Sequence, residues 1–163
     1  EEVFYGQMWK NSWVKALDKW ETRWTESFRI TQNIGRGMIF TGTNNWKNYT
    51  VSSKLKFHLV KSGGIAVRIQ GLKRYYALEL TSNKKLRIVK MLYDLEILKE
   101  IDFDFKFYKE YDLTLKIEEN ILKGSVNNEV FLEFEDKNTP LEHGGIGFIV
   151  ESGTQSTNEI IIS

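Results

Sequence analysis

Apolar and polar residues alternate along the chain from Tyr49 onward. In residues 50–60, Val51 and Phe57 fall on one face of an extended strand and His58 falls on the other. Clusters of Gly, Asn and Ser interrupt this alternation about every 8–12 residues. A period of two that recurs between short turn clusters predicts an all-β, antiparallel sandwich or barrel.

The turn clusters predict how these strands are connected. We expect Ser62-Gly63-Gly64 to form a hairpin turn and residues 71–74 a second one, so that three strands make a meander. Asn127-Asn128 suits a tight hairpin turn, and Gly35-Arg36-Gly37 is interpreted as a turn with a basic tip. For residues 7–24, where Trp spacing is close to helical, a strand followed by a loop is favoured. The later strands are predicted at 65–70, 75–80, 86–89, 98–107, 111–117, 121–126, 130–134, 146–150 and 160–162.

The composition is that of a globular domain. The chain has 163 residues, of which 41% are hydrophobic and 13% aromatic, enough to form a sizeable core. No linker, repeat or low-complexity tract divides it, so a single β-sandwich domain over residues 1–163 is expected. Because the sequence starts Glu1-Glu2-Val3, with neither an initiator Met nor a leader, we expect a module cut from a larger protein.

Charge and composition exclude several functional classes. The 23 Lys and Arg residues against 22 Asp and Glu give a formal net charge of +1, so no nucleic-acid or membrane partner is expected. The absence of Cys excludes thiolate nucleophiles and zinc-thiolate sites, and two His residues are too few for a histidine metal cluster. Localisation stays open between a bacterial secreted and a cytoplasmic protein.

Several short elements occur in an order typical of one superfamily. They are Gly42-Thr43-Asn44-Asn45-Trp46-Lys47-Asn48-Tyr49-Thr50-Val51, a strand carrying Arg68, the Arg74-Tyr75-Tyr76 strand, Tyr111-x-Leu113-x-Leu115 and Gly144-Gly145-Ile146-Gly147-Phe148. In these elements the chain resembles concanavalin A-like lectin and glucanase β-sandwich modules. It is similar to the C-terminal sandwich of bacterial ADP-ribosylglycohydrolase-like proteins and to carbohydrate-binding modules.

This resemblance implies an antiparallel jelly roll of two sheets with a concave, sugar-binding face. It also implies a possible structural calcium ion and a catalytic domain elsewhere in the parent chain. Hydrolase activity is not implied for this module, because the helical magnesium-binding domain has no counterpart in the sequence. The family's Trp-x-Asp-Tyr element is Trp46-Lys47-Asn48-Tyr49 here and lacks its carboxylate.

The register of the predicted meander places polar side chains on one outer face, around the small residues Ala66 and Ala77. Planar guanidinium, amide and carboxylate groups suit paired sugar hydroxyls, and an aromatic ring suits sugar C–H groups. Alternatively, Arg68 pairs with Glu79 on an ordinary solvated sheet. The predicted ligand-binding residues are Arg68 and Gln70 as donors, Glu79 as acceptor, Tyr75 as stacking platform, and His58 and Trp46 beside them.

A second candidate is the acidic run Glu100, Asp102 and Asp104, which a period of two places on one strand face. Retaining glycosidases use two carboxyl groups about 5–5.5 Å apart. The short connections around this run leave little room for a cleft. We therefore favour a non-catalytic carbohydrate-binding module over a sandwich glycoside hydrolase that uses these carboxylates, and over a purely structural interdomain module.

Overall fold

A computed structural model describes residues 12–23 and 26–163 as an all-β, antiparallel protein, which confirms the predicted fold class. In this part of the chain no helix is long and apolar enough to cross a membrane. The strands are β1 (Val14–Ala16), β2 (Lys19–Arg23), β3 (Glu26–Thr41), β4 (Tyr49–Gly71), β5 (Arg74–Thr81), β6 (Lys85–Leu92), β7 (Asp94–Asp102), β8 (Glu110–Glu118), β9 (Ile121–Val126), β10 (Glu129–Glu135), β11 (Gly145–Thr157) and β12 (Ile161–Ile162).

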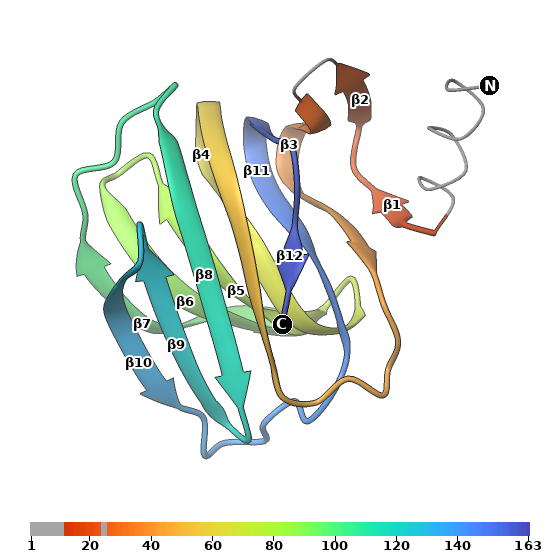
Figure 1. Cartoon of the computed structure of the whole chain (residues 1–163), viewed down its shortest axis with the longest axis vertical. Helices are drawn as coiled ribbons and strands as arrows, with labels where there is room; N and C mark the ends of the chain where they lie inside the picture. Colours follow the sequence, from red (N-terminus) through yellow and green to blue (C-terminus); the bar gives the residue numbers. More distant parts are fainter. Residues whose placement is uncertain (1–11, 24–25) are drawn as a thin grey trace.

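Two layers face each other, and the long strand β4 belongs to both. Its first part, from Tyr49 to Lys56, pairs with β8, which continues through β9 to β10. Its second part, from Ser62 to Gly71, pairs with β5, which continues through β6 to β7. We call these the front layer and the back layer, as Figure 1 shows them. The two predicted sheets are thus one hydrogen-bonded sheet folded over on itself.

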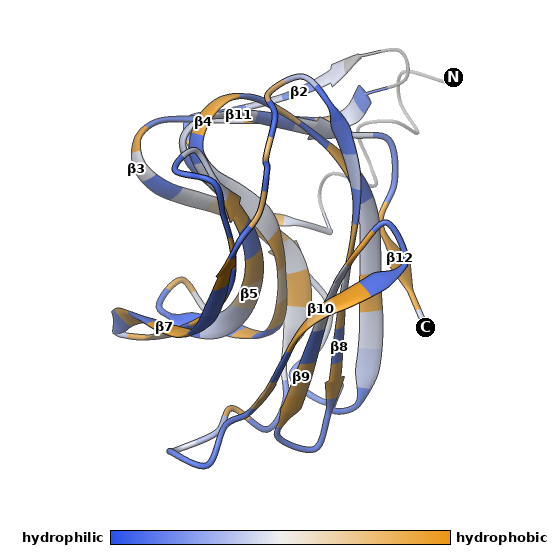
Figure 2. Ribbon diagram, turned by 90° about the vertical axis from the view of Figure 1, so that its left-hand side faces the viewer, coloured by the Kyte–Doolittle hydropathy of each residue, from blue (hydrophilic) through white to orange (hydrophobic). Residues whose placement is uncertain are grey.

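The core fills the space between the layers. Side chains that alternate along the strands supply it, among them Val51 and Phe57 of β4, Leu78 of β5 and Leu113 of β8, all fully buried. The apolar segments of Figure 2 accordingly recur along both layers. Burial of apolar surface is the dominant stabilising contribution in such a sandwich.

The predicted hairpin at Ser62-Gly63-Gly64 is wrong, because these residues lie inside β4. The glycines allow close packing there rather than a turn. A Cβ on Gly63 would lie 2.1 Å from Oε1 of Gln155, and a Cβ on Gly64 would lie 1.8 Å from the carbonyl oxygen of Leu78. The predicted meander and its cross-strand rows therefore do not form.

An irregularity near the end of β4 changes which side chains face outward. Val67 pairs with Tyr76 and Gly71 pairs with Arg74, so β4 contains two more residues than β5 over this interval. Arg68 has a φ of 48°, in the left-handed region that non-glycine residues rarely adopt. The bulge places Ile69 in a separate apolar cluster on the outer side of the back layer, with Ala66 and Ala77.

Other turn predictions have mixed outcomes. Asn127 and Asn128 form the β9–β10 turn as predicted, both with positive φ. Gly35-Arg36-Gly37 is not a turn tip, because it lies within β3. In the N-terminal stretch the structure shows strands β1 and β2, whereas residues 7–11 and 24 lie outside the described residues.

Candidate functional site

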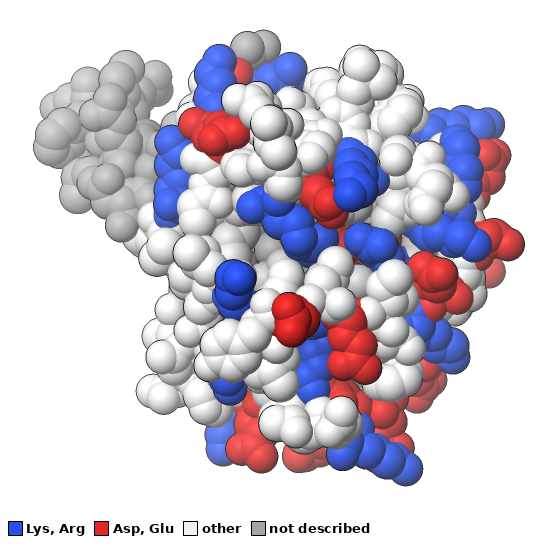
Figure 3. Space-filling view, turned by 180° about the vertical axis from the view of Figure 1, so that it is seen from behind, with Lys and Arg blue, Asp and Glu red and all other residues white. Residues whose placement is uncertain are grey.

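The outer face of the back layer, turned away from the front layer, has a composition unusual for a solvent-facing sheet. The back layer curves so that this face is hollow (Figure 2). Small and apolar residues cover its middle, including Ala66 and Ala77, as predicted. Charged side chains gather around a depression near the centre of the same face (Figure 3). A buried apolar cluster and buried charges occur together here, outside the main core.

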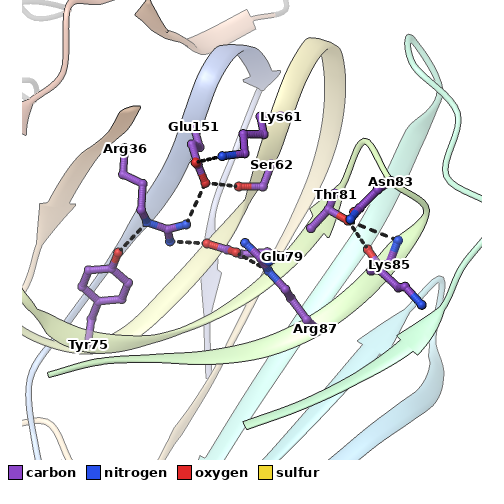
Figure 4. A network of polar contacts seen from close by, with 10 residues as sticks. All are labelled: Arg36, Lys61, Ser62, Tyr75, Glu79, Thr81, Asn83, Lys85, Arg87 and Glu151. Atoms are coloured by element: carbon purple, nitrogen blue, oxygen red, sulfur yellow. Dashed lines mark hydrogen bonds and ion pairs between the residues drawn. The ribbon is translucent and has the colours of Figure 1, made fainter. Parts of the chain in front are cut away.

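Glu79 is at the centre of these charges (Figure 4). It is 0% exposed, and each of its carboxylate oxygens is bonded to a different guanidinium group. Arg36 of β3 donates from Nη2 to Oε1, and Arg87 of β6 donates from Nε to Oε2 at 2.9 Å. The β5–β6 register places Glu79 directly opposite Arg87.

Arg36 extends this arrangement toward β11. Its Nε donates to the hydroxyl of Tyr75 at 3.1 Å, and its Nη1 donates to Oε2 of Glu151 at 3.3 Å. Glu151 also accepts from Ser62 at 3.0 Å and from the Nζ atom of Lys61 at 2.9 Å. We call this set the outer-face network: Arg36, Lys61, Ser62, Tyr75, Glu79, Arg87 and Glu151 (Figure 4).

The charges within the network shift its acid–base equilibria. Burial alone would lower the pKa of the Arg36 guanidinium, but the charges and hydrogen bonds of Glu79 and Tyr75 outweigh it and raise that pKa. Burial alone would raise the pKa of Glu151, but hydrogen bonds from Lys61 and Ser62 and the charge of Arg36 lower it. The network thus holds Arg36 and Glu151 in their charged forms.

This gives the first testable prediction, which concerns pH. Because the pKa of Glu151 is lowered in the folded state, its stabilising contribution is present above its ordinary value of 4.5 and is lost as pH falls through the folded pKa. We expect the free energy of unfolding to fall on acidification below about pH 4.5, and to fall less steeply in Glu151→Gln. Urea unfolding followed between pH 6 and pH 3 measures both slopes, and equal slopes would contradict the prediction.

A cavity of about 260 Å³ opens beside the network. Arg36, Lys73 and Tyr75 supply its polar atoms. Its remaining walls are apolar or backbone, from Ala16, Gly37, Met38, Leu72 and Met91. Polar donors beside a small apolar surface are the usual composition of a small-molecule site.

Two of the predicted ligand-binding residues, Tyr75 and Glu79, lie in this network. The predicted role of Tyr75 as an exposed stacking platform is wrong, because its ring is 2% exposed and lies below the guanidinium of Arg36. Its hydroxyl instead accepts a hydrogen bond from Arg36. The alternative pairing of Arg68 with Glu79 is also wrong, since Arg36 and Arg87 occupy the Glu79 carboxylate.

Arg68 and Gln70 lie apart from the network because of the β4 bulge. The guanidinium of Arg68 donates to the carbonyl oxygens of Leu141, at 2.6 Å, and Lys47, at 3.0 and 3.1 Å. Gln70 donates to the carbonyl oxygen of His143 at 2.8 Å. Arg68 thereby connects two loops at one end of the sandwich by hydrogen bonds. A second cavity, of about 440 Å³, lies beside it and is lined by Lys47, Asn48, Arg68, Glu119, Asn120, Pro140 and Glu142.

His58 and Trp46 are also placed elsewhere. His58 lies in the part of β4 before Ser62, where its Nε2 atom is 3.1 Å from Oγ of Ser156. Trp46 packs edge-on against Tyr49 beside the core, and a Cβ on Gly42 would lie 2.7 Å from its ring. The structure therefore does not bring the six predicted residues to one face.

The acidic run lies on the exposed edge strand β7. Strand β7 ends at Asp102, so the prediction that Asp104 shares this strand with Glu100 and Asp102 is wrong. The Asp102 and Asp104 side chains are 90% and 78% exposed, and each pairs with lysine. This is the geometry of a solvated strand face.

The resemblance also implies a structural calcium ion, which takes a carboxylate-rich ligand set. In residues 12–23 and 26–163 no group of three or more His, Cys, Asp and Glu side chains is arranged to hold a metal ion. No step of the proposed function therefore depends on calcium.

Arg36 and Arg87, two of the central residues, are not among the predicted ligand-binding residues. Arg87 falls between the core residues Leu86 and Ile88, so alternation alone places it on the outer face. The short turn after Thr81 then sets it opposite Glu79. Arg36 had no comparable local signal, because its position depends on the pairing of β3 with β11, more than a hundred residues away.

Solved structures share this architecture. Carbohydrate-binding module CBM66 from Bacillus subtilis aligns with a TM-score of 0.84 and 14% identity, over 93% of this chain and 95% of that one. A galectin from Caenorhabditis elegans aligns with a TM-score of 0.58 and 11% identity, over 94% of this chain and 96% of that one. An alginate lyase of polysaccharide lyase family 7 aligns with a TM-score of 0.66 and 12% identity, over 94% of each chain.

No protein-family model and no curated protein matches the sequence. The structural neighbours include both binding modules and an enzyme, so the likeness concerns the architecture. The fold is the antiparallel jelly-roll sandwich that the sequence resemblance implied.

Proposed function

We propose that this chain is a non-catalytic carbohydrate-binding module that holds a glycan on the outer face of its back layer. The observation that carries the proposal is the outer-face network beside an open cavity. Burying charged groups costs several kcal/mol per ion, on the order of the whole stability margin of a domain, unless partners compensate for it. A network of five charged side chains on an open face fits a binding role better than a purely structural one.

The network presents hydrogen-bond donors in fixed directions. Arg87 is 15% exposed in its side chain and, among the described residues, bonds through Nε to Glu79 and through no other atom. Its two terminal nitrogens are therefore available to a ligand. A guanidinium plane matches the spacing of paired oxygens, and Glu79 fixes that plane.

The apolar side chains beside the network suit the rest of a sugar. The faces of a sugar ring carry C–H groups, which pack against apolar side chains while the hydroxyls bond at the rim. Met38 and Met91 line the cavity next to Arg36 and supply such a surface. CBM66 from Bacillus subtilis, which has the same architecture, is a carbohydrate-binding module, and this supports the same class of ligand here.

The exposed acidic edge supports no catalytic role in this proposal. Asp102 is paired with Lys85 at 2.5 Å and is almost fully exposed, whereas a catalytic acid needs a shielded environment that raises its pKa. The module would bring substrate to a catalytic domain of the parent protein, as the sequence resemblance implies.

A glycan array followed by calorimetry on the best ligand tests the proposal. We expect the wild type to bind, and we expect Arg87→Gln to weaken binding about tenfold, because a charge-assisted pair of hydrogen bonds is lost. The matched control is Lys137→Gln, which removes one positive charge from a side chain that is 77% exposed and pairs with Glu135.

Two results would contradict the proposal. One is the absence of glycan binding by the folded wild type. The other is a ligand bound equally well by the wild type and Arg87→Gln, because the glycan would then occupy a different surface. Circular dichroism of each variant confirms that the compared proteins are folded.

A further inference from the structure

We infer that the glycan held on the outer face is anionic and carries carboxylate or sulfate groups on its sugar rings. This inference rests on the proposed function and names its ligand class. The structure points to it through the groups that remain accessible once all bonds within the outer-face network are counted.

The carboxylates of the network are already occupied. Glu79 is 0% exposed and both of its oxygens accept from guanidinium groups. Glu151 is 13% exposed in its side chain, and its oxygens accept from Arg36, Lys61 and Ser62. Glu79 is closed to solvent and Glu151 is nearly so, which leaves few acceptors for the hydroxyl groups of a neutral sugar.

The accessible groups of the network are donors with positive charge. Arg87 has two terminal nitrogens without a partner among the described residues, and Lys61 is 68% exposed. Glu100, the register partner of Arg87 on β7, makes no ion pair with a described residue and leaves those nitrogens unbonded. Within the network itself, three cations face two carboxylates, which gives it a formal charge of +1.

The cavity beside the network is also lined by positively charged side chains. Among the described residues, Arg36 and Lys73 are the charged members of its lining, and no described carboxylate residue contributes to it. Lys73 lies in the turn between β4 and β5, next to Leu72, whose side chain is 54% exposed. An anionic sugar ring can place its charged group against these donors and its C–H face against Met38 and Met91.

Matched pairs of probes test the charge requirement. We expect oligogalacturonate to bind and its neutral methyl ester to bind at least about tenfold more weakly, because esterification removes the charge and keeps the rings. Dextran sulfate against dextran forms the second pair, and the two pairs distinguish carboxylate from sulfate as the recognised group. Affinity for the anionic probe should fall as the salt concentration rises.

Single substitutions test whether the anionic probe binds beside Lys73 and Arg87. Lys73→Gln is expected to weaken anionic binding about twofold to fivefold, as is typical of exposed charge pairs, and Arg87→Gln to weaken it about tenfold. Lys137→Gln removes the same charge far from the network in sequence and should bind like the wild type. Lys73 bonds to no other side chain of the described residues, so its replacement leaves the fold intact.

The outcomes separate this inference from the proposed function. Binding of a neutral glycan through Arg87, with no preference for its charged counterpart, would overturn the inference and leave the proposed function standing. Failure of every glycan to bind would overturn both. Polyglutamate bound as tightly as oligogalacturonate would also overturn the inference, because it would show attraction to any polyanion.

Discussion

Replacing Lys90 by Met is expected to lower the free energy of unfolding by about 3–5 kcal/mol, because it leaves a buried carboxylate without its cation. The side chains of Lys90 and Asp136 are each 3% exposed, and Nζ of Lys90 lies 2.7 Å from Oδ2 of Asp136. Burial alone would raise the pKa of Asp136, but the hydrogen bonds from Lys90 and Tyr76 outweigh it and lower that pKa.

The expected loss is large because the pair also fixes the loop that follows β10. Lys90 donates to the carbonyl oxygens of Asn138 and Thr139, at 2.5 and 2.8 Å. Tyr76 donates to Asp136 at 2.6 Å and accepts from the backbone N–H of Leu141 at 2.9 Å. Lys90→Met therefore removes the hydrogen bonds that hold the loop after β10 and also leaves the Asp136 carboxylate without its cation.

Thermal and urea unfolding measure this effect. A loss of this size corresponds to a melting temperature lowered by roughly 6–20 °C for a chain of this length. Lys137→Met is the matched control, because its ion pair with Glu135 is exposed, and its unfolding curve should stay close to that of the wild type. A wild-type-like curve for Lys90→Met would show that the buried pair does not hold the loop.

The sequence predicted the fold class because the evidence for it is local. Alternation places Val51, Phe57, Leu113 and Leu115 in the core, and the same period recurs in strand after strand. Two adjacent asparagines at 127 and 128 specify a tight turn by their tolerance of positive φ. Such signals depend on a few neighbouring residues and so can be interpreted without knowing the tertiary structure.

The error at residues 62–64 shows where local signals fail. A Ser-Gly-Gly cluster is typical of a hairpin turn. Glycines also occur inside a strand where a neighbouring chain segment packs too closely to leave room for a side chain. Here Gln155 of β11 and Leu78 of β5 occupy the space that side chains at 63 and 64 would need. Both neighbours are distant in sequence, so the choice between turn and strand depends on the fold itself.

The candidate site was predicted in part for the same reason. Tyr75 and Glu79 share a strand face by simple alternation, and Ala66 and Ala77 lie on the outer face as expected, although they pair with each other and not with Glu79 and Arg68 as the predicted rows required. Arg68 was assigned to this group because regular alternation was assumed through a bulge that only the fold reveals. One of the two cations that bond Glu79 is Arg36, which the β3–β11 pairing brings to this face.

The second large effect is expected at Arg36. Arg36→Met removes one of the two cations bonded to Glu79, a carboxylate with no exposed surface, and also removes a partner of Glu151. We expect a loss of about 3–5 kcal/mol in the free energy of unfolding, the usual cost of leaving a buried charge partly unpaired. Tyr75→Phe, which removes a hydrogen bond that the same charged guanidinium donates, should cost about 1.5–3 kcal/mol.

A double variant separates the charge from the packing. In Arg36→Met with Glu79→Gln the buried negative charge is gone along with its cation, so we expect the pair of changes to cost less than the sum of the two single variants. Urea unfolding of the wild type, the two single variants and the double variant gives the four free energies of this double-mutant cycle. Strict additivity would show that Arg36 and Glu79 do not stabilise each other, and the outer-face network would then be a set of independent contacts. Coupling of more than about 1 kcal/mol would instead show that Arg36 and Glu79 stabilise each other as a prearranged pair, which is the rigidity that a binding face for a charged sugar requires.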